Sequence, residues 1–151
     1  MTNEEDQGPS LNEMRAFAYR LLGRREYSMA ELTDRLVRKW PSASGIEHLV
    51  TQLAGENLVS DERYAESFIR SRIQRHQGPL KIKAELRHRG IGDALIDEGL
   101  RPHSDNWHQL ASEWLRGQHA GEFNLDEKQK YYRRLVNRGF THDQAMSAVN
   151  T

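Results

Sequence analysis

Apolar side chains recur along this chain at steps of three and four residues. The first such stripe contains Met14, Phe17, Ala18, Leu21 and Leu22. This spacing places apolar side chains on one face of an α-helix, because a helix makes one turn in about 3.6 residues. Similar stripes follow over residues 29–40, 46–53, 64–73 and 107–115. No stretch alternates cleanly enough to predict a β-strand, and the Asn-Gly and Asp-Gly pairs typical of hairpin turns are absent.

Helix starts and stops divide these stripes. A Ser or Thr followed three residues later by Glu or Gln is the capping-box pattern, in which both side chains satisfy backbone N–H groups at a helix start. The pattern occurs at Ser10/Glu13, Ser28/Glu31, Ser44/Glu47 and Thr141/Gln144. Gly78-Pro79 predicts another start, because Pro in the first helical turn lacks an N–H that would have no partner there. Gly90 and Gly139, each followed by an apolar residue, predict helix ends in the left-handed conformation.

These signals together predict nine helices in three groups of three. The expected ranges are 11–24, 28–40 and 44–56; 60–76, 79–89 and 93–100; and 104–118, 126–138 and 141–149. A similar pentad ends the middle helix of each group: LVRKW at 36–40, LRHRG at 86–90 and LVNRG at 135–139. A pattern that returns about every fifty residues is typical of repeated structural units.

Short helices bury their apolar stripes only against neighbours, so a three-helix unit is the smallest stable piece. Units of this kind joined in line form extended bodies. We therefore predict an all-α fold, a tandem array of three three-helix repeats that forms an elongated, curved body. The expected parts are a disordered N-terminal tail at 1–9 and repeats at 10–58, 59–102 and 103–151.

Charge changes this picture only through its distribution. The chain has 22 Lys and Arg against 22 Asp and Glu, so its net charge gives no argument for nucleic acid. Residues 63–92, however, hold two acids and eight cations: Arg63, Arg70, Arg72, Arg75, Lys81, Lys83, Arg87 and Arg89. This bias is typical of a solvated helical surface, or of a surface that meets DNA phosphates or an acidic protein. The stretch PLKIKAEL after Gly78 offers mostly Lys and aliphatic side chains, so we expect no sequence-specific reading of DNA bases.

Sequence motifs typical of catalytic, metal-binding or nucleotide-binding sites are absent. The chain has no cysteine, no His pair at metal-ligand spacing, no G-x-S-x-G, no P-loop and no G-x-G-x-x-G. We therefore expect no metal, no cofactor, no small-molecule substrate and no catalysis. The N-terminus is acidic, unlike a signal peptide, and no run approaches the ~20 apolar residues that span a bilayer. We expect a cytoplasmic protein and, without a coiled-coil seam, a monomer.

Three stretches resemble the RecX family, the regulatory proteins of the bacterial recombinase RecA. They are AYRLLGRREYSMAEL at 18–32, DERYAESFIRSR at 61–72 and GPLKIKAELRHRGI at 78–91, and KYYRRLVNRGF at 130–140 resembles the last unit of the family. The resemblance covers roughly residues 11–150. The chain departs from the family pattern at Trp40-Pro41 and His76-Gln77, where glycine is common. The family often has two acids before Arg-Tyr, and Ser60-Asp61-Glu62 keeps this acid character.

This resemblance implies three-helix repeats that bind in the helical groove of a RecA filament on single-stranded DNA. It implies reduced ATP hydrolysis, strand exchange and coprotease activity of RecA, and so a role in DNA repair, recombination and the SOS response. The eight cations would approach the filament and its DNA. A second set of residues would hold the shape: Asp61, Tyr64, Gly78, Pro79, Leu86, Gly90 and Gly139. The residues leave two alternatives open. One is a DNA-binding helical module that acts on recombination by competing for single- or double-stranded DNA, and the other is a structural adaptor with no link to DNA.

Overall fold

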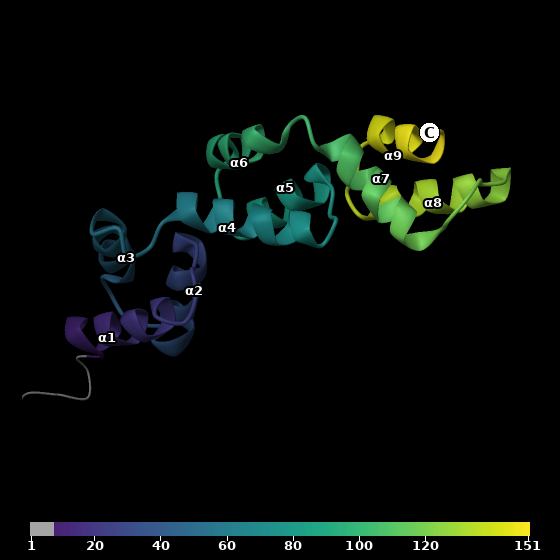
Figure 1. Cartoon of the computed structure of the whole chain (residues 1–151). Coiled ribbons are helices and arrows are strands. Elements are labelled where there is room, and N and C mark those ends of the chain that lie inside the picture. The colour runs from purple at the N-terminus through teal and green to yellow at the C-terminus, as the bar shows by residue number, and fades with distance from the viewer. Residues whose placement is uncertain (1–7) are drawn as a thin grey trace, which may run out of the picture. The chain divides into compact units, whose positions relative to one another are not determined.

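The computed structural model describes residues 8–151 and is all-α over that range (Figure 1). Its helices are α1 Leu11–Leu22, α2 Met29–Lys39, α3 Ile46–Gly55, α4 Asp61–Gln74, α5 Pro79–His88, α6 Asp93–Leu100, α7 Trp107–Gln118, α8 Leu125–Asn137 and α9 His142–Val149, with a short 3-10 helix, η2, at Arg101–His103. Each predicted helix is present, with bounds within one helical turn of the predicted ones. The prediction of a disordered tail at 1–9 falls mostly on residues 1–7, which lie outside the described residues. Within residues 8–151, no helix combines the length and the apolar character needed to cross a membrane.

Side chains cap most of the helix starts. Ser28 with Glu31 and Thr141 with Gln144 form reciprocal capping boxes, as the sequence predicts, and the Ser10 hydroxyl accepts a hydrogen bond from the Glu13 amide. The predicted box of Ser44 with Glu47 is wrong. The chain enters α3 through Gly45 at φ 83°, with no side-chain cap, so Ser44 lies one position too early to reach the first turn. A box that the sequence search missed joins Asn124 to Glu127 at the start of α8.

The chain divides into two compact units. The described part of unit 1 contains residues 8–64 and 89–91, and unit 2 contains residues 65–88 and 92–151. The predicted repeat bounds at 58 and 102 stay a prediction, because unit 2 holds most of the second predicted repeat together with the third. The elongated, curved shape likewise stays a prediction.

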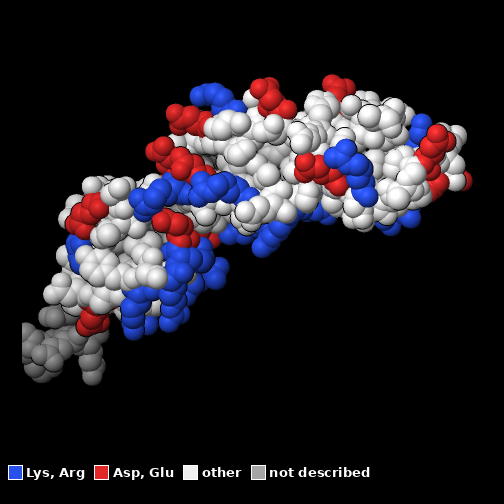
Figure 2. All heavy atoms as spheres, viewed as in Figure 1, with Lys and Arg blue, Asp and Glu red and all other residues white. Residues whose placement is uncertain are grey.

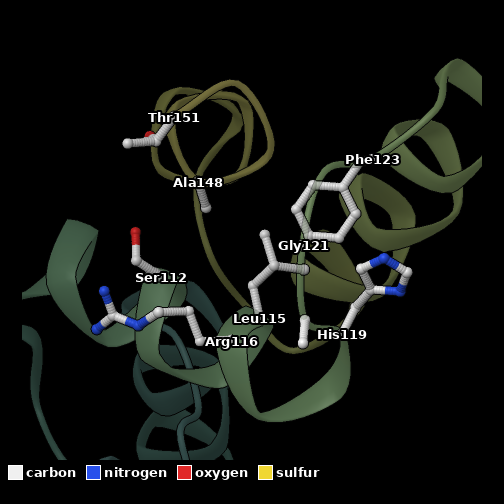
Figure 3. A pocket seen from close by; sticks show the side chains of 9 residues that line it. Ser112, Leu115, Arg116, His119, Gly121, Phe123, Ala148 and Thr151 are labelled. Atoms are coloured by element: carbon white, nitrogen blue, oxygen red, sulfur yellow. The ribbon is translucent and has the colours of Figure 1, made fainter.

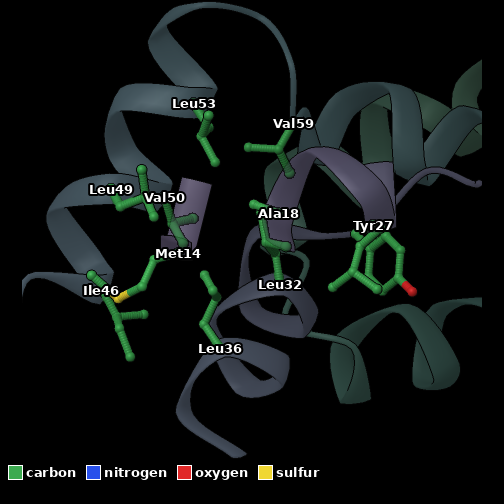
Figure 4. Packing of buried hydrophobic residues seen from close by; sticks show 11 residues of the cluster. Met14, Ala18, Tyr27, Leu32, Leu36, Ile46, Leu49, Val50, Leu53 and Val59 are labelled. Carbon is green, nitrogen blue, oxygen red and sulfur yellow. The ribbon is translucent and has the colours of Figure 1, made fainter. Parts of the chain in front are cut away.

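Unit 1 is held together by the apolar faces of α1, α2 and α3, which pack on one another (Figure 4). Met14 and Ala18 come from α1, and Leu32 and Leu36 come from α2. Helix α3 contributes Ile46, Leu49, Val50 and Leu53. Complete burial of a Leu or Ile side chain stabilises the fold by about 1.5–3 kcal/mol, so this cluster is the main source of stability in the unit. The helical spacing of the sequence therefore predicts this core correctly.

Unit 2 contains α5, α6 and the last three helices. Helix α9 packs on both α7 and α8, and α5 packs on α6. The largest fully buried side chains of this unit are Ile69, Ile82, Leu86, Ile96, Leu135 and Phe140. Leu86 and Leu135 are the first residues of their pentads, so each pentad begins in a core.

Contacts at the ends of two pentads give a structural reason for the repeated Arg-Gly pair. In unit 1, the Ser28 hydroxyl donates to the carbonyl of Arg89 at 2.7 Å, and Gly90, at φ 84°, lies so close to Ala30 that a Cβ on Gly90 would overlap it. In unit 2, the Gly78 amide donates to the carbonyl of Arg138 at 2.8 Å. Each Arg-Gly pair thus lies against the start of the middle helix that precedes it in the chain, α2 or α5.

Candidate interaction surfaces

Five of the eight predicted cations have a carboxylate partner within their own unit. The pairs are Arg63–Glu26 at 3.1 Å, Arg72–Glu85 at 3.2 Å, Lys83–Asp97 at 3.2 Å, Arg87–Asp93 at 2.7 Å and Arg89–Glu31 at 3.2 Å. A cation that is already paired has less to gain from a new anion, because the first pair must be broken or shared. The eight predicted cations therefore differ in how readily each can bind a further anion.

Two of the pairs in unit 2 show this difference. Arg87 donates from Nε and Nη2 to both carboxylate oxygens of Asp93, at 2.7 and 3.0 Å. This hydrogen bond lowers the pKa of Asp93 and raises that of Arg87, although both side chains are exposed and the pair adds little stability. Arg72 is less exposed, and its guanidinium lies 4.4 Å from the centre of the Phe68 ring. Arg72 therefore serves packing as well as charge.

In unit 1, Arg89 and Asp61 hold the start of α2. The Arg89 guanidinium donates to the Tyr64 hydroxyl at 2.9 Å and to Glu31 at 3.2 Å. Burial, and next the nearby charge of Glu31, raise the pKa of Tyr64. The Asp61 carboxylate accepts a hydrogen bond from the Met29 amide at 2.8 Å.

Ser60 and Asp61, at the start of α4, have different hydrogen-bond partners. The Ser60 hydroxyl accepts a hydrogen bond from the Arg63 amide at 3.2 Å, so Ser60 is the cap. Asp61 is thereby free to bind the start of α2.

Three of the predicted cations remain available to an anion. Arg70, Arg75 and Lys81 are exposed, and their side chains form no ion pair with any residue of the described chain. All three belong to unit 2, on or directly after α4 and on α5. These three are the strongest candidates of the predicted set for contact with a phosphate or an acidic protein.

Sequence reasoning missed the role of Arg138. Its Nε donates to the carbonyl of His76 at 3.0 Å, and its Nη2 donates to the carbonyl of Arg75. Burial lowers the pKa of Arg138, and the guanidinium lies 5.2 Å from the centre of the Trp114 ring. The signal was present in the sequence, because Arg138 and Arg89 hold the same position in their pentads.

A second cationic surface lies in unit 1. Figure 2 shows Lys and Arg side chains gathered over α2. Four exposed cations on α1, after it and on α2 have no carboxylate partner within the described chain: Arg20, Arg24, Arg35 and Lys39. The Lys39 ammonium lies 4.7 Å from the centre of the Phe17 ring, which fixes it near the end of α2. The basic residues Arg38 and Lys39 of the pentad 36–40 are a sequence signal for this surface, although cations are denser over residues 63–92.

One hollow in unit 2 offers no catalytic arrangement among the residues that line it. It has a volume of about 530 Å³ and is lined by Leu115, Phe123 and Ala148, with Ser112, Arg116 and His119 at its polar edge (Figure 3). The His119 Nδ1 lies 3.3 Å from Glu127, and no hydrogen bond joins Ser112 to a base among the described residues. Within residues 8–151, no group of three His, Cys, Asp or Glu side chains is arranged to hold a metal ion.

Comparison with known proteins gives consistent results over most of the chain. A family model described as RecX, second three-helix domain, matches residues 60–100. A protein named regulatory protein RecX from Chromohalobacter salexigens is 42% identical over 137 residues, which cover 87% of this chain and 88% of that protein. Another protein of that name, from Halorhodospira halophila, is 34% identical over 146 residues, which cover 95% and 91%.

Solved structures share the fold. The crystal structure of RecX from Lactobacillus salivarius aligns with a TM-score of 0.79, at 22% identity, over 92% of this chain and 94% of that one. A second crystal structure, of a regulatory protein RecX, aligns with a TM-score of 0.73, also at 22% identity, over 93% and 73%. At this identity the alignments show a common all-helical fold and nothing more. Evidence for the family comes from the sequence relatives, at 34–42% identity.

Proposed function

Because this chain belongs to the RecX family of regulatory proteins, we propose that it regulates RecA, mainly as an inhibitor, by binding the RecA–single-stranded DNA filament. In this proposal it acts in the cytoplasm as a monomer without catalysis of its own. Its binding reduces the ATPase, strand-exchange and coprotease activities of RecA during DNA repair, recombination and the SOS response. The observation that carries the proposal is 34–42% identity to proteins named regulatory protein RecX over most of both chains.

The physical features of the chain support a role in binding. Its helices present exposed cations in both units. A filament offers the same surface at every protomer. Moderate contacts made by successive repeats would therefore combine, because each later contact forms at a high effective concentration.

In this proposal the cations without an ion pair contribute most. Arg70, Arg75 and Lys81 are exposed and unpaired with carboxylates in the described chain, so in this proposal they contact the filament or its DNA. Arg63, Arg72, Lys83, Arg87 and Arg89 are paired within their units and contribute less.

The test compares two double charge reversals. Arg70→Glu with Lys81→Glu changes the net charge by the same amount as Arg101→Glu with Arg116→Glu, a control pair that is also exposed in unit 2. We expect the first variant to need about tenfold more protein to inhibit the RecA ATPase on single-stranded DNA, while the control stays close to wild type. Undiminished inhibition by the first variant, with the helical circular dichroism spectrum unchanged, would remove these residues from the proposed surface.

The unpaired cations of unit 1 favour a second candidate function, competition for DNA. In that case binding to bare DNA would weaken steeply with salt, with a log–log slope of about −0.7 to −0.9 for each neutralised phosphate. Inhibition would disappear when DNA is in excess over both proteins. Filament binding predicts that inhibition persists under that condition and that RecA recruits the chain to DNA.

A further inference from the structure

An apolar stripe on α8 faces solvent. Leu125, Tyr132 and Val136 are separated by seven and four positions, which places them on one face of the helix. Leu125 is 70% exposed and Val136 is 40% exposed. Leu135 and Tyr131 of the same helix are buried, so α8 has one apolar face in the core of unit 2 and a second one outside it.

This second face borders a groove between α8 and α9. The groove has a volume of about 380 Å³, and apolar groups dominate its lining: Leu125, Tyr132, Met146 and Val149. The Tyr132 hydroxyl lies 2.7 Å from His142 Nδ1 at the start of α9, which fixes the tyrosine ring. Met146 remains 39% exposed within it. We call this feature the α8–α9 groove.

Two cations border the α8–α9 groove. Lys128 lies on the α9 side, where its ammonium donates to the Asn150 side-chain oxygen at 3.4 Å. Arg133 lies five positions further along α8, which by helical geometry is the opposite side of the stripe. Neither side chain has a carboxylate partner in the described part of the chain. Asp126 and Asp143 lie in the first turns of α8 and α9, where the positive ends of the helices attract them, and Glu127 lies 3.3 Å from His119.

We propose that the α8–α9 groove binds one amphipathic helix of a partner protein, with carboxylates on both sides of its apolar stripe. Insertion of an apolar helix face into a hydrophobic groove is a common mode of peptide recognition. The exposed Leu125 and Met146 supply the apolar contact, and Lys128 and Arg133 select an acidic helix over a basic one by charge complementarity. This surface is distinct from Arg70, Arg75 and Lys81, so the inference does not depend on the proposed function.

The probe for this inference is a synthetic helical peptide with Leu at positions i, i+4, i+7 and i+11 and Glu on both sides of that stripe. A second peptide has Lys in place of every Glu. Each is titrated into the full-length chain, and the backbone amides are followed by NMR. We expect saturable shifts for residues of α8 and α9 with the Glu peptide, and binding at least tenfold weaker with the Lys peptide.

Charge reversal in the protein provides the matched test. We expect Arg133→Glu to weaken the Glu peptide about fivefold to tenfold and to strengthen the Lys peptide, while Arg116→Glu, outside the groove, changes neither. The gain for the Lys peptide keeps the test independent of any loss of folding. Equal binding of both peptides, shifts confined to other helices, or concentration-dependent shifts of the same amides without peptide would overturn the inference. The last of these would identify a second copy of the chain as the occupant.

Discussion

The backbones of Gly78 and Gly139 lie in close contact in unit 2. A Cβ placed on Gly78 would overlap the carbonyl carbon of Gly139 and the amide nitrogen of Phe140, which are backbone atoms that cannot rotate away. Gly139 itself has φ 99°, a conformation in which other residues are strained, and a Cβ on it would overlap Lys81. The two glycines therefore depend on each other.

We expect Gly78→Ala to lower the free energy of unfolding by about 2–3 kcal/mol, because the added methyl group forces two backbone segments apart. The matched control is Gly117→Ala on α7, where a Cβ meets no atom within 4 Å. There the change should be neutral or stabilise by up to about 1 kcal/mol, because alanine is the better helix former. Urea denaturation of both variants with a common slope measures the difference. Equal stabilities would mean that the Gly78–Gly139 contact relaxes without cost.

The individual cations of the site could be predicted from the sequence only in part. All eight lie in the helices or turns where the apolar pattern places them, but their partners could not be read from the pattern. Arg63 reaches Glu26, 37 positions away, and Arg89 reaches Glu31, 58 positions away. Such pairs form only once the chain has folded. Local spacing therefore predicts which side chains are charged and outside the core, and the fold decides which of them remain unpaired.

Among the elements, the start of α2 has the densest set of hydrogen bonds. Ser28 is fully buried, caps the Glu31 amide and donates to the carbonyl of Arg89. Ser10 has the same role at α1 with a single exposed bond to the Glu13 amide. Serine at the same helix position therefore makes two hydrogen bonds through its hydroxyl at α2 and one at α1.

We expect Ser28→Ala to destabilise the protein by about 2–3 kcal/mol, because it leaves a helix amide and a part-buried carbonyl without partners. Ser10→Ala, the control, removes one exposed cap and should cost about 0.5–1 kcal/mol. Thermal and urea denaturation report both. If the two variants lose the same stability, the bond from Ser28 to Arg89 contributes nothing.

Tyr64 should make the fold sensitive to alkaline pH. Burial, followed by the charge of Glu31, raises its pKa above the ordinary value of 10.0. A raised pKa in the folded state means that the contribution of Tyr64 is fully present below pH 10.0 and is lost as the pH rises through the folded pKa, since the unfolded chain releases the proton first. We expect wild type to lose more stability than Tyr64→Phe above pH 10.0, measured by urea denaturation at a series of pH values. Parallel curves for the two proteins would contradict this account.

The helices themselves are the part of the fold that the sequence predicts best. Stripes at three- and four-residue steps and the caps at Ser28 and Thr141 identify the elements, because both signals are local. The errors are local as well. The box at Ser44 fails because Gly45 takes the cap position, and Asn124 was missed because the search considered only Ser and Thr as caps.

At the scale of the whole molecule, the repeats are related but not identical. Helix α2 begins seven positions before the Leu of its pentad, from Met29 to Leu36, and α5 does the same from Pro79 to Leu86. Helix α8 begins ten positions before Leu135, so it has almost one additional turn at its start. On α5 an Arg-Gly backbone lies against the helix start, as the bond from the Leu80 amide to Gly139 shows. The longer start of α8 distinguishes this helix from α2 and α5.

This organisation predicts that the two units lose their structure separately. Leu36 in unit 1 and Leu135 in unit 2 are the first residues of their pentads, and both are fully buried. Replacement of either by Ala should cost about 2–5 kcal/mol of local stability. In hydrogen exchange on the full-length chain, we expect Leu36→Ala to speed exchange in α1–α3 and to leave α8 and α9 near wild type, and Leu135→Ala to do the reverse.

Exchange of the Gly78 and Leu80 amides, at the start of α5, makes this last test more specific. The amides of Gly78 and Leu80 bond to the carbonyls of Arg138 and Gly139, so Leu135→Ala should expose them together with α8. Leu36→Ala should leave them protected, because their partners lie in unit 2. Local opening of this kind is expected where contacts are made mainly between neighbouring repeats. Equal loss of protection in both units, whichever Leu is replaced, would show one cooperative body and contradict the division into units.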